Sequence, residues 1–72
     1  MPPEELEHEV MVHRYLYYVV CETILTDREY DNLEREARRT LPESSPVHGA
    51  GSSLPSSYSA EVIVDAERRM GC

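Results

Sequence analysis

The chain has no lysine, no tryptophan and no phenylalanine, so all seven of its cationic side chains are arginines and its aromatic side chains are tyrosines. Fourteen acidic residues leave a formal net charge of −7. Nucleic-acid binding draws on clustered cations that neutralise phosphates, so we expect no direct contact with DNA or RNA. The charge favours a basic protein partner, with solubility alone as the alternative interpretation.

Cysteine is scarce as well, and long apolar runs are missing. Cys21 and Cys72 form neither a Cys-x-x-Cys pair nor a disulfide framework, so reduced thiols in the cytoplasm are the simplest interpretation. No apolar run approaches membrane-spanning length, and the first twenty residues are too acidic for a signal peptide. We therefore expect a cytoplasmic protein without membrane contact.

Seventy-two residues, 40% of them hydrophobic, predict one small domain over residues 1–72. Pro2 and Pro3 followed by acidic residues are typical of a helix start, and we predict a helix over residues 4–20. Tyr15 and Tyr18 are expected to project from the sides of this helix. Its buried stripe, at helical spacing, consists of Leu6, Val10, His13, Tyr17 and Val20.

A second helix is predicted over residues 26–41, because Thr26 and Glu29 have the spacing of a capping box and Pro42 ends the segment. Residues 42–59 are rich in serine and proline and are expected to form a loop. Residues 60–70 are predicted to form a third helix, with a short strand at residues 62–64 as the alternative. The fold class is therefore all-α: a two-helix hairpin, a loop and a weaker C-terminal helix.

Metal binding and catalysis find little support in the pattern. His8, His13, Cys21 and His48 lack paired ligand spacing, so no metal site is expected. Cys21 has no nearby cationic cluster that would activate it as a nucleophile. We predict no catalytic residue and a protein that is not an enzyme.

The tyrosines and carboxylates around the predicted hairpin have either a structural role or a role in contacts with a ligand or partner. Helix-start electrostatics and capping account for Asp27 and Glu29, and packing between helices accounts for Tyr17 and Tyr30. Asp31 is explained less well by capping and is a better candidate for a polar contact. Exposed tyrosines are favoured anchors at protein interfaces. The expected partner-binding residues are therefore Tyr15, Tyr18, Arg14 and Met11.

One stretch resembles the small helical first (Ia) domain of bacterial NAD-dependent DNA ligases. The similarity covers about residues 13–49. The matching residues are Tyr17-Tyr18-Val19, then Asp27-Arg28-Glu29-Tyr30-Asp31-Asn32-Leu33, and more loosely Ser45-Pro46-Val47-His48-Gly49.

The resemblance implies a site for the nicotinamide-mononucleotide (NMN) half of NAD. The residues on the family's pocket positions are Tyr17, Tyr18, Asp27, Tyr30 and Asp31. Aromatic faces stack on a nicotinamide ring, and carboxylates accept hydrogen bonds from its carboxamide or from ribose. The family's adenylated nucleophile is a lysine, which this chain lacks, so we expect no ligation by this polypeptide.

As a whole, the chain also looks like small acidic phage proteins that bind host RNA polymerase. Our leading hypothesis is such a regulator: a monomer without cofactor in the host cytoplasm that binds the polymerase and causes transcription inhibition or antitermination. The alternatives are an NMN- or NAD-binding module and an accessory piece that complements a ligase lacking its own first domain.

Overall fold

The computed structural model describes residues 2–22, 24–49 and 54–71. Within these ranges the chain forms three α-helices, α1 (Pro3–Tyr15), α2 (Asp27–Thr40) and α3 (Ala60–Met70), and no strand. Short helical turns occur at η1 (Leu16–Val20), η2 (Pro46–His48) and η3 (Pro55–Ser57). The predicted all-α class is confirmed. Among the described helices, none combines the length and apolar character needed to span a bilayer.

The first helical segment changes its geometry before it ends. Pro3 lies in the first turn of α1 beside Glu4 and Glu5, as the helix-start pattern predicts. After Tyr15 the chain continues as the π-helical turn η1, which reaches Val20. A π turn contains more residues than an α turn, so side chains beyond Tyr15 face directions that α-helical spacing does not predict.

The observed burial in this segment differs from part of the predicted buried stripe. Tyr17 and Val20, which were expected to be buried, are 47% and 39% exposed, whereas Leu16 is fully buried. Tyr15, expected to project outward, is buried against Tyr58 with ring centroids 5.3 Å apart. The first part of the stripe is as predicted, because Leu6, Val10 and His13 are buried.

Helix α2 begins with the predicted capping box. The Thr26 hydroxyl accepts a hydrogen bond from the Glu29 amide, and the Glu29 carboxylate accepts one from the Thr26 amide, both at 3.2 Å. Helix α3 begins in a similar way, because the Ser59 hydroxyl accepts from the Val62 amide at 3.3 Å. This cap and the helix that follows show that the strand alternative at residues 62–64 is wrong.

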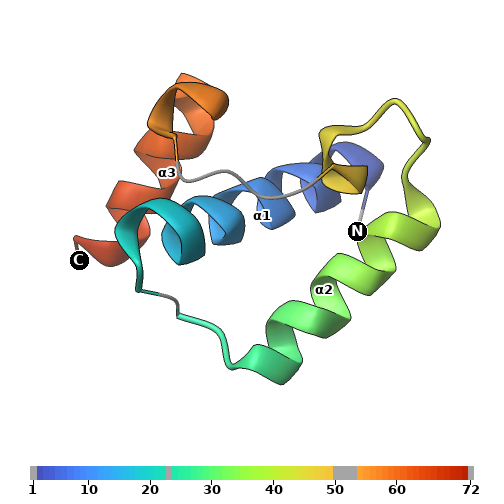
Figure 1. The fold of residues 1–72 in the computed structure, drawn as a ribbon, viewed down its shortest axis with the longest axis horizontal. Helices are drawn as coiled ribbons and strands as arrows, with labels where there is room; N and C mark the ends of the chain where they lie inside the picture. The colour runs from blue at the N-terminus through green and yellow to red at the C-terminus, as the bar shows by residue number, and fades with distance from the viewer. Residues whose placement is uncertain (1, 23, 50–53, 72) are drawn as a thin grey trace.

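Helix α1 lies between the other two helices and packs against both of them (Figure 1). Its contacts divide the core into two clusters. One joins α1 and η1 to α3 and contains Val12, Tyr15, Leu16, Tyr58, Val62 and Ala66. The other joins α1 to α2 and contains Leu6, Val10, Ala37, Leu41 and Val47. Met11 packs against both clusters.

The serine- and proline-rich segment contributes more to the core than its composition predicts. Val47, in η2, is fully buried and packs in the α1–α2 cluster. Tyr58, directly after η3, is 7% exposed and packs in the α1–α3 cluster. Each residue is an isolated apolar position in a polar segment, so periodicity gives no sign of its burial.

Candidate functional site

The candidate site is a cleft of about 350 Å³ between η1 and the N-terminal half of α2. Two of its residues lie on η1, and the others lie at successive turns of α2. The cleft is lined by Tyr17, Tyr18, Asp27, Tyr30, Asp31 and Glu34. The structure therefore brings together all five residues that the ligase resemblance assigns to the ligand, and it adds Glu34.

Tyrosine rings form one wall of the cleft. Tyr17 and Tyr30 are stacked, with centroids 5.7 Å apart and an interplanar angle of 20°. Tyr18 meets Tyr17 edge to face, with centroids 5.0 Å apart. Tyr17 and Tyr18 lie in the π turn and are exposed, while Tyr30 is half-buried. The result is an aromatic surface of the kind on which planar or cationic rings bind.

Two carboxylates at the cleft, Asp27 and Asp31, are available for hydrogen bonding. Both are exposed, and among the described residues neither carboxylate forms a hydrogen bond or a salt bridge. Capping is carried out by Glu29 and Thr26 instead, so the capping role considered for Asp27 does not use its side chain. The carboxylates of Asp27 and Asp31 are therefore free to accept hydrogen bonds from a bound molecule.

A buried arginine supports the floor of the cleft. Arg14 is 2% exposed, and its Nη2 donates to Glu34 Oε1 at 2.6 Å and to the Val47 carbonyl at 2.6 Å. Arg14 thereby ties α1 to α2 and to η2. Glu34 also accepts a hydrogen bond from Arg38 at 3.1 Å. Burial opposes ionisation of Glu34, but the bonds from Arg14 and Arg38 outweigh it and hold its pKa below its ordinary value.

The same cluster changes the acidity of the stacked tyrosine. Burial and the nearby Glu34 carboxylate raise the pKa of Tyr30 to about 12, and the Arg14 guanidinium works in the opposite direction. Tyr30 therefore stays a neutral phenol throughout the physiological range. Its ring keeps the electron-rich face that attracts cations.

Three of the four predicted partner-binding residues are not exposed, and their role in binding a partner stays a prediction. Arg14 and Tyr15 are buried, and Met11 is half-buried between the two core clusters. Of the four residues, Tyr18 alone is exposed, at 40%. Arginine is rarely buried, so the sequence pattern gives little warning of the Arg14 contacts. Glu34 was also missed, although its place one turn after Tyr30 and Asp31 puts it on the same helix face.

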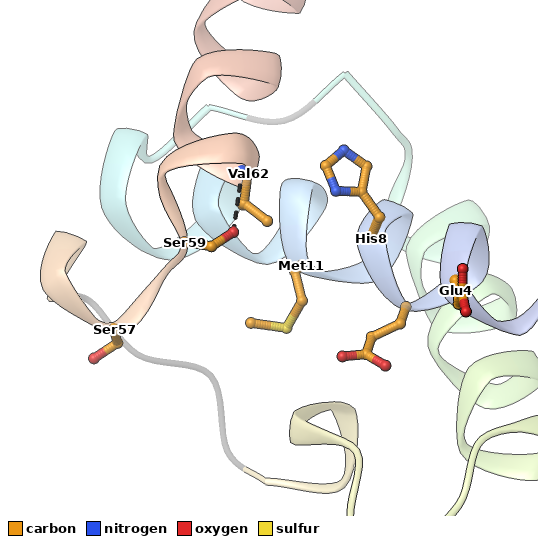
Figure 2. Close-up of a pocket in the computed structure, with 7 residues that line it drawn as sticks. Glu4, His8, Met11, Ser57, Ser59 and Val62 are labelled. Carbon is orange, nitrogen blue, oxygen red and sulfur yellow. Dashed lines mark hydrogen bonds between the residues drawn. The ribbon is translucent and has the colours of Figure 1, made fainter.

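A second groove, of about 370 Å³, lies between α1 and the segment that leads into α3 (Figure 2). Met11 and Val62 give it an apolar character, with Ser57 and Glu4 at opposite edges. Two of its polar groups are engaged elsewhere, because Ser59 caps α3 and His8 bonds to Asp65 at 2.8 Å, while the carboxylates of Glu4 and Glu7 form no bond with a described residue.

The histidines and the described cysteine do not come together. His13 is buried beside Glu9, at 3.6 Å, and His48 contacts the Leu41 carbonyl at 3.0 Å. Cys21 is exposed and forms no disulfide, while Cys72 lies outside the described residues. No group of three potential metal ligands occurs in the part of the chain that the structure describes.

Known proteins with similar sequences are DNA ligases. The DNA ligase of Pelotomaculum thermopropionicum is 50% identical over 36 residues, which is 50% of this chain and 5% of that protein. The DNA ligases of Thermotoga petrophila and Thermotoga maritima are each 38% identical in an alignment 58 residues long, and the match covers 71% of this chain and 8% of each ligase. No family model and no solved structure matches.

The chain spans less than a tenth of the length of these curated relatives. The matches support the resemblance to the N-terminal region of DNA ligases. They give no support to the resemblance to phage regulators, which stays a prediction. Over half or more of its length, the chain is therefore similar to a small N-terminal part of bacterial DNA ligases.

Proposed function

We propose that this chain is a binding module for the NMN half of NAD and performs no chemical step itself. The observation that carries the proposal is the cleft, where stacked Tyr17 and Tyr30 lie beside the free carboxylates of Asp27 and Asp31. These residues also occupy the positions to which the ligase resemblance assigns the ligand. The similarity to DNA ligases supports this function over the regulator hypothesis.

The chemistry of the cleft matches that of the oxidised nicotinamide ring. The ring is planar and carries a positive charge, so it stacks on tyrosine faces with a cation–π contribution. Its carboxamide has two N–H donors, and the ribose has two hydroxyl donors. The Asp27 and Asp31 carboxylates are acceptors for such donors.

A chemical-shift titration with NMN tests the proposal. We expect saturable shifts at the amides of η1 and the first turns of α2, whose side chains line the cleft. Asp31→Asn should weaken binding about tenfold, because it replaces a charged acceptor of hydrogen bonds. Glu36→Gln is the matched control, since Glu36 lies on the same helix, does not line the cleft and pairs with Arg39.

Ring charge provides a second arm of the same experiment. Reduced NMN has the same ribose and phosphate but a neutral ring, so it should bind more weakly than oxidised NMN. No shift at millimolar NMN would remove the proposal. Equal losses in the Asp31 and Glu36 variants would show that net charge, and not the cleft, governs binding.

A second candidate is the polymerase-binding regulator, which the exposed apolar surface favours. Tyr18, Val20 and Ile24 are each about 40% exposed or more, and the net charge of −7 suits a basic partner surface. The test is co-purification with RNA polymerase from a bacterial lysate, followed by in vitro transcription. Failure of both assays would eliminate this candidate.

A further inference from the structure

The aromatic cleft continues along α2 into a second hollow. This hollow has a volume of about 330 Å³ and is lined by Asp31, Glu34, Arg35 and Arg38. Asp31 and Glu34 line both spaces, so the two adjoin. The lining residues of α2 recur every three or four positions and therefore share one helix face.

Charge changes sign along this face. The end beside the tyrosines carries the free carboxylates of Asp27 and Asp31, and the other end carries the guanidinium groups of Arg35 and Arg38. Arg35 forms no salt bridge with a described residue. A molecule lying along the face would have carboxylates beside one end, which suit a cationic ring. It would have guanidinium groups beside the other end, which suit an anionic group.

Arg38 is able to leave its present partner without exposing an uncompensated charge. It bonds to Glu34 at 3.1 Å, and its own side chain is 49% exposed. Glu34 is held independently by the buried Arg14, at 2.6 Å. If Arg38 turned toward another anion, Glu34 would keep its Arg14 partner. The rearrangement therefore breaks only an exposed ion pair, which contributes little to stability.

We propose that Arg35 and Arg38 form a phosphate subsite, so that the module recognises a nucleotide with a cationic ring rather than the corresponding nucleoside. This inference rests on the proposed function, since it places the ring in the aromatic cleft. The helix rises about 6 Å from Asp31 to Arg35, a separation that one ribose bridges. Guanidinium groups present paired N–H donors that suit phosphate oxygens.

Binding of NMN and of nicotinamide riboside, which differ by the phosphate alone, tests the subsite. We expect the full chain to bind NMN about tenfold more tightly than the riboside. The variant Arg35→Gln/Arg38→Gln should abolish this preference, so that NMN binds no more tightly than the riboside. Both arginines are exposed, and a circular-dichroism melt checks that the variant is folded.

The control variant, Arg39→Gln/Arg68→Gln, has the same net charge as the test variant, but its changed residues line neither hollow. It should keep the preference for NMN. An equal loss in control and test variants would overturn the subsite, because bulk charge would then explain the effect. Equal affinity for both ligands would also overturn it while leaving the proposed function standing. Binding of neither ligand would overturn the subsite together with the proposed function.

Discussion

Cys21 ends the first helical segment in the left-handed conformation, with φ of 65°. The next amide, that of Glu22, donates to the Leu16 carbonyl at 3.0 Å, as in glycine-terminated helix ends. A side chain with a Cβ is strained in this region, whereas glycine is not. The thiol itself is exposed and makes only a weak contact with the Val19 carbonyl.

Replacing Cys21 with glycine should therefore stabilise the fold. Relief of left-handed strain contributes about 1–2 kcal/mol, and the greater freedom of glycine in the unfolded chain subtracts about 0.4–1 kcal/mol. We expect the free energy of unfolding in urea to rise by about 0.5–1 kcal/mol. Cys21→Ala keeps the Cβ and removes the thiol, so it should show no such gain. A gain in the alanine variant would mean that the thiol destabilises the fold.

The individual site residues were predictable only where a local signal exists. The spacing of Tyr17, Tyr18, Asp27, Tyr30 and Asp31 matches a known motif, and these residues line one cleft. The contact that supports them could not be predicted, because Arg14 lies 20 positions before Glu34 and 33 before Val47. Such long-range pairing leaves no trace in local periodicity.

At the scale of elements, the capping pattern predicted the start of a helix correctly, whereas hydrophobic periodicity was less successful in predicting which side chains are buried. The capping box placed the start of α2 correctly, because its hydrogen bonds form within four consecutive residues. The helical stripe failed at η1. Leu16 is buried with Val12, four positions earlier, on the side of α1 that packs against α3, whereas Tyr17 is exposed.

Helix α3 packs in one of the two core clusters, and α2 packs in the other. Besides the apolar cluster, α3 is attached to α1 by Arg69, which bonds to both Glu9 oxygens at 2.9 and 2.6 Å. Arg69 also bonds to Asp65 at 3.0 Å. The bidentate geometry and partial burial make this contact stronger than a typical surface ion pair.

Arg69→Gln should weaken the attachment of α3 by about 1 kcal/mol. Native-state hydrogen exchange is the suitable measurement, because it reports on each helix separately. We expect faster exchange in α3 and little change in α2. Arg68→Gln, at an exposed residue without a salt bridge to a described residue, is the control. Equal acceleration of α2 and α3 would show that the two helices open together.

For the molecule as a whole, buried His13 makes stability depend on pH. Burial lowers the pKa of His13 below its ordinary value of 6.5, and the Glu9 carboxylate offsets this only in part. The folded state thus binds fewer protons than the unfolded state as the pH falls through 6.5. The free energy of unfolding must therefore decrease from that pH downward.

Urea denaturation between pH 7.5 and about 5 measures this effect. This pH interval lies above the ordinary pKa values of the carboxyl groups, so their protonation does not dominate the result. We expect the wild type to lose stability as the pH falls below about 6.5. His13→Gln should show a flatter profile, since it has no group to protonate at this position. A wild-type profile as flat as that of the variant would contradict the assignment to His13.

The all-α class was predictable because α1 and α2 each carry a helix-start signal, while the packing of the loop was not. Val47 and Tyr58 are buried by contacts with distant helices, and their neighbours in the sequence are mostly polar. Their contribution emerges only when α1 brings both halves of the chain together.

The aromatic wall of the cleft has a consequence for how this protein is studied. Without tryptophan, the ultraviolet emission of the molecule comes from its five tyrosines, and three of them, Tyr17, Tyr18 and Tyr30, line the cleft. A guest ring stacked there would quench a large part of the total signal. Occupancy of the cleft is thus readable by intrinsic fluorescence, without attaching any dye.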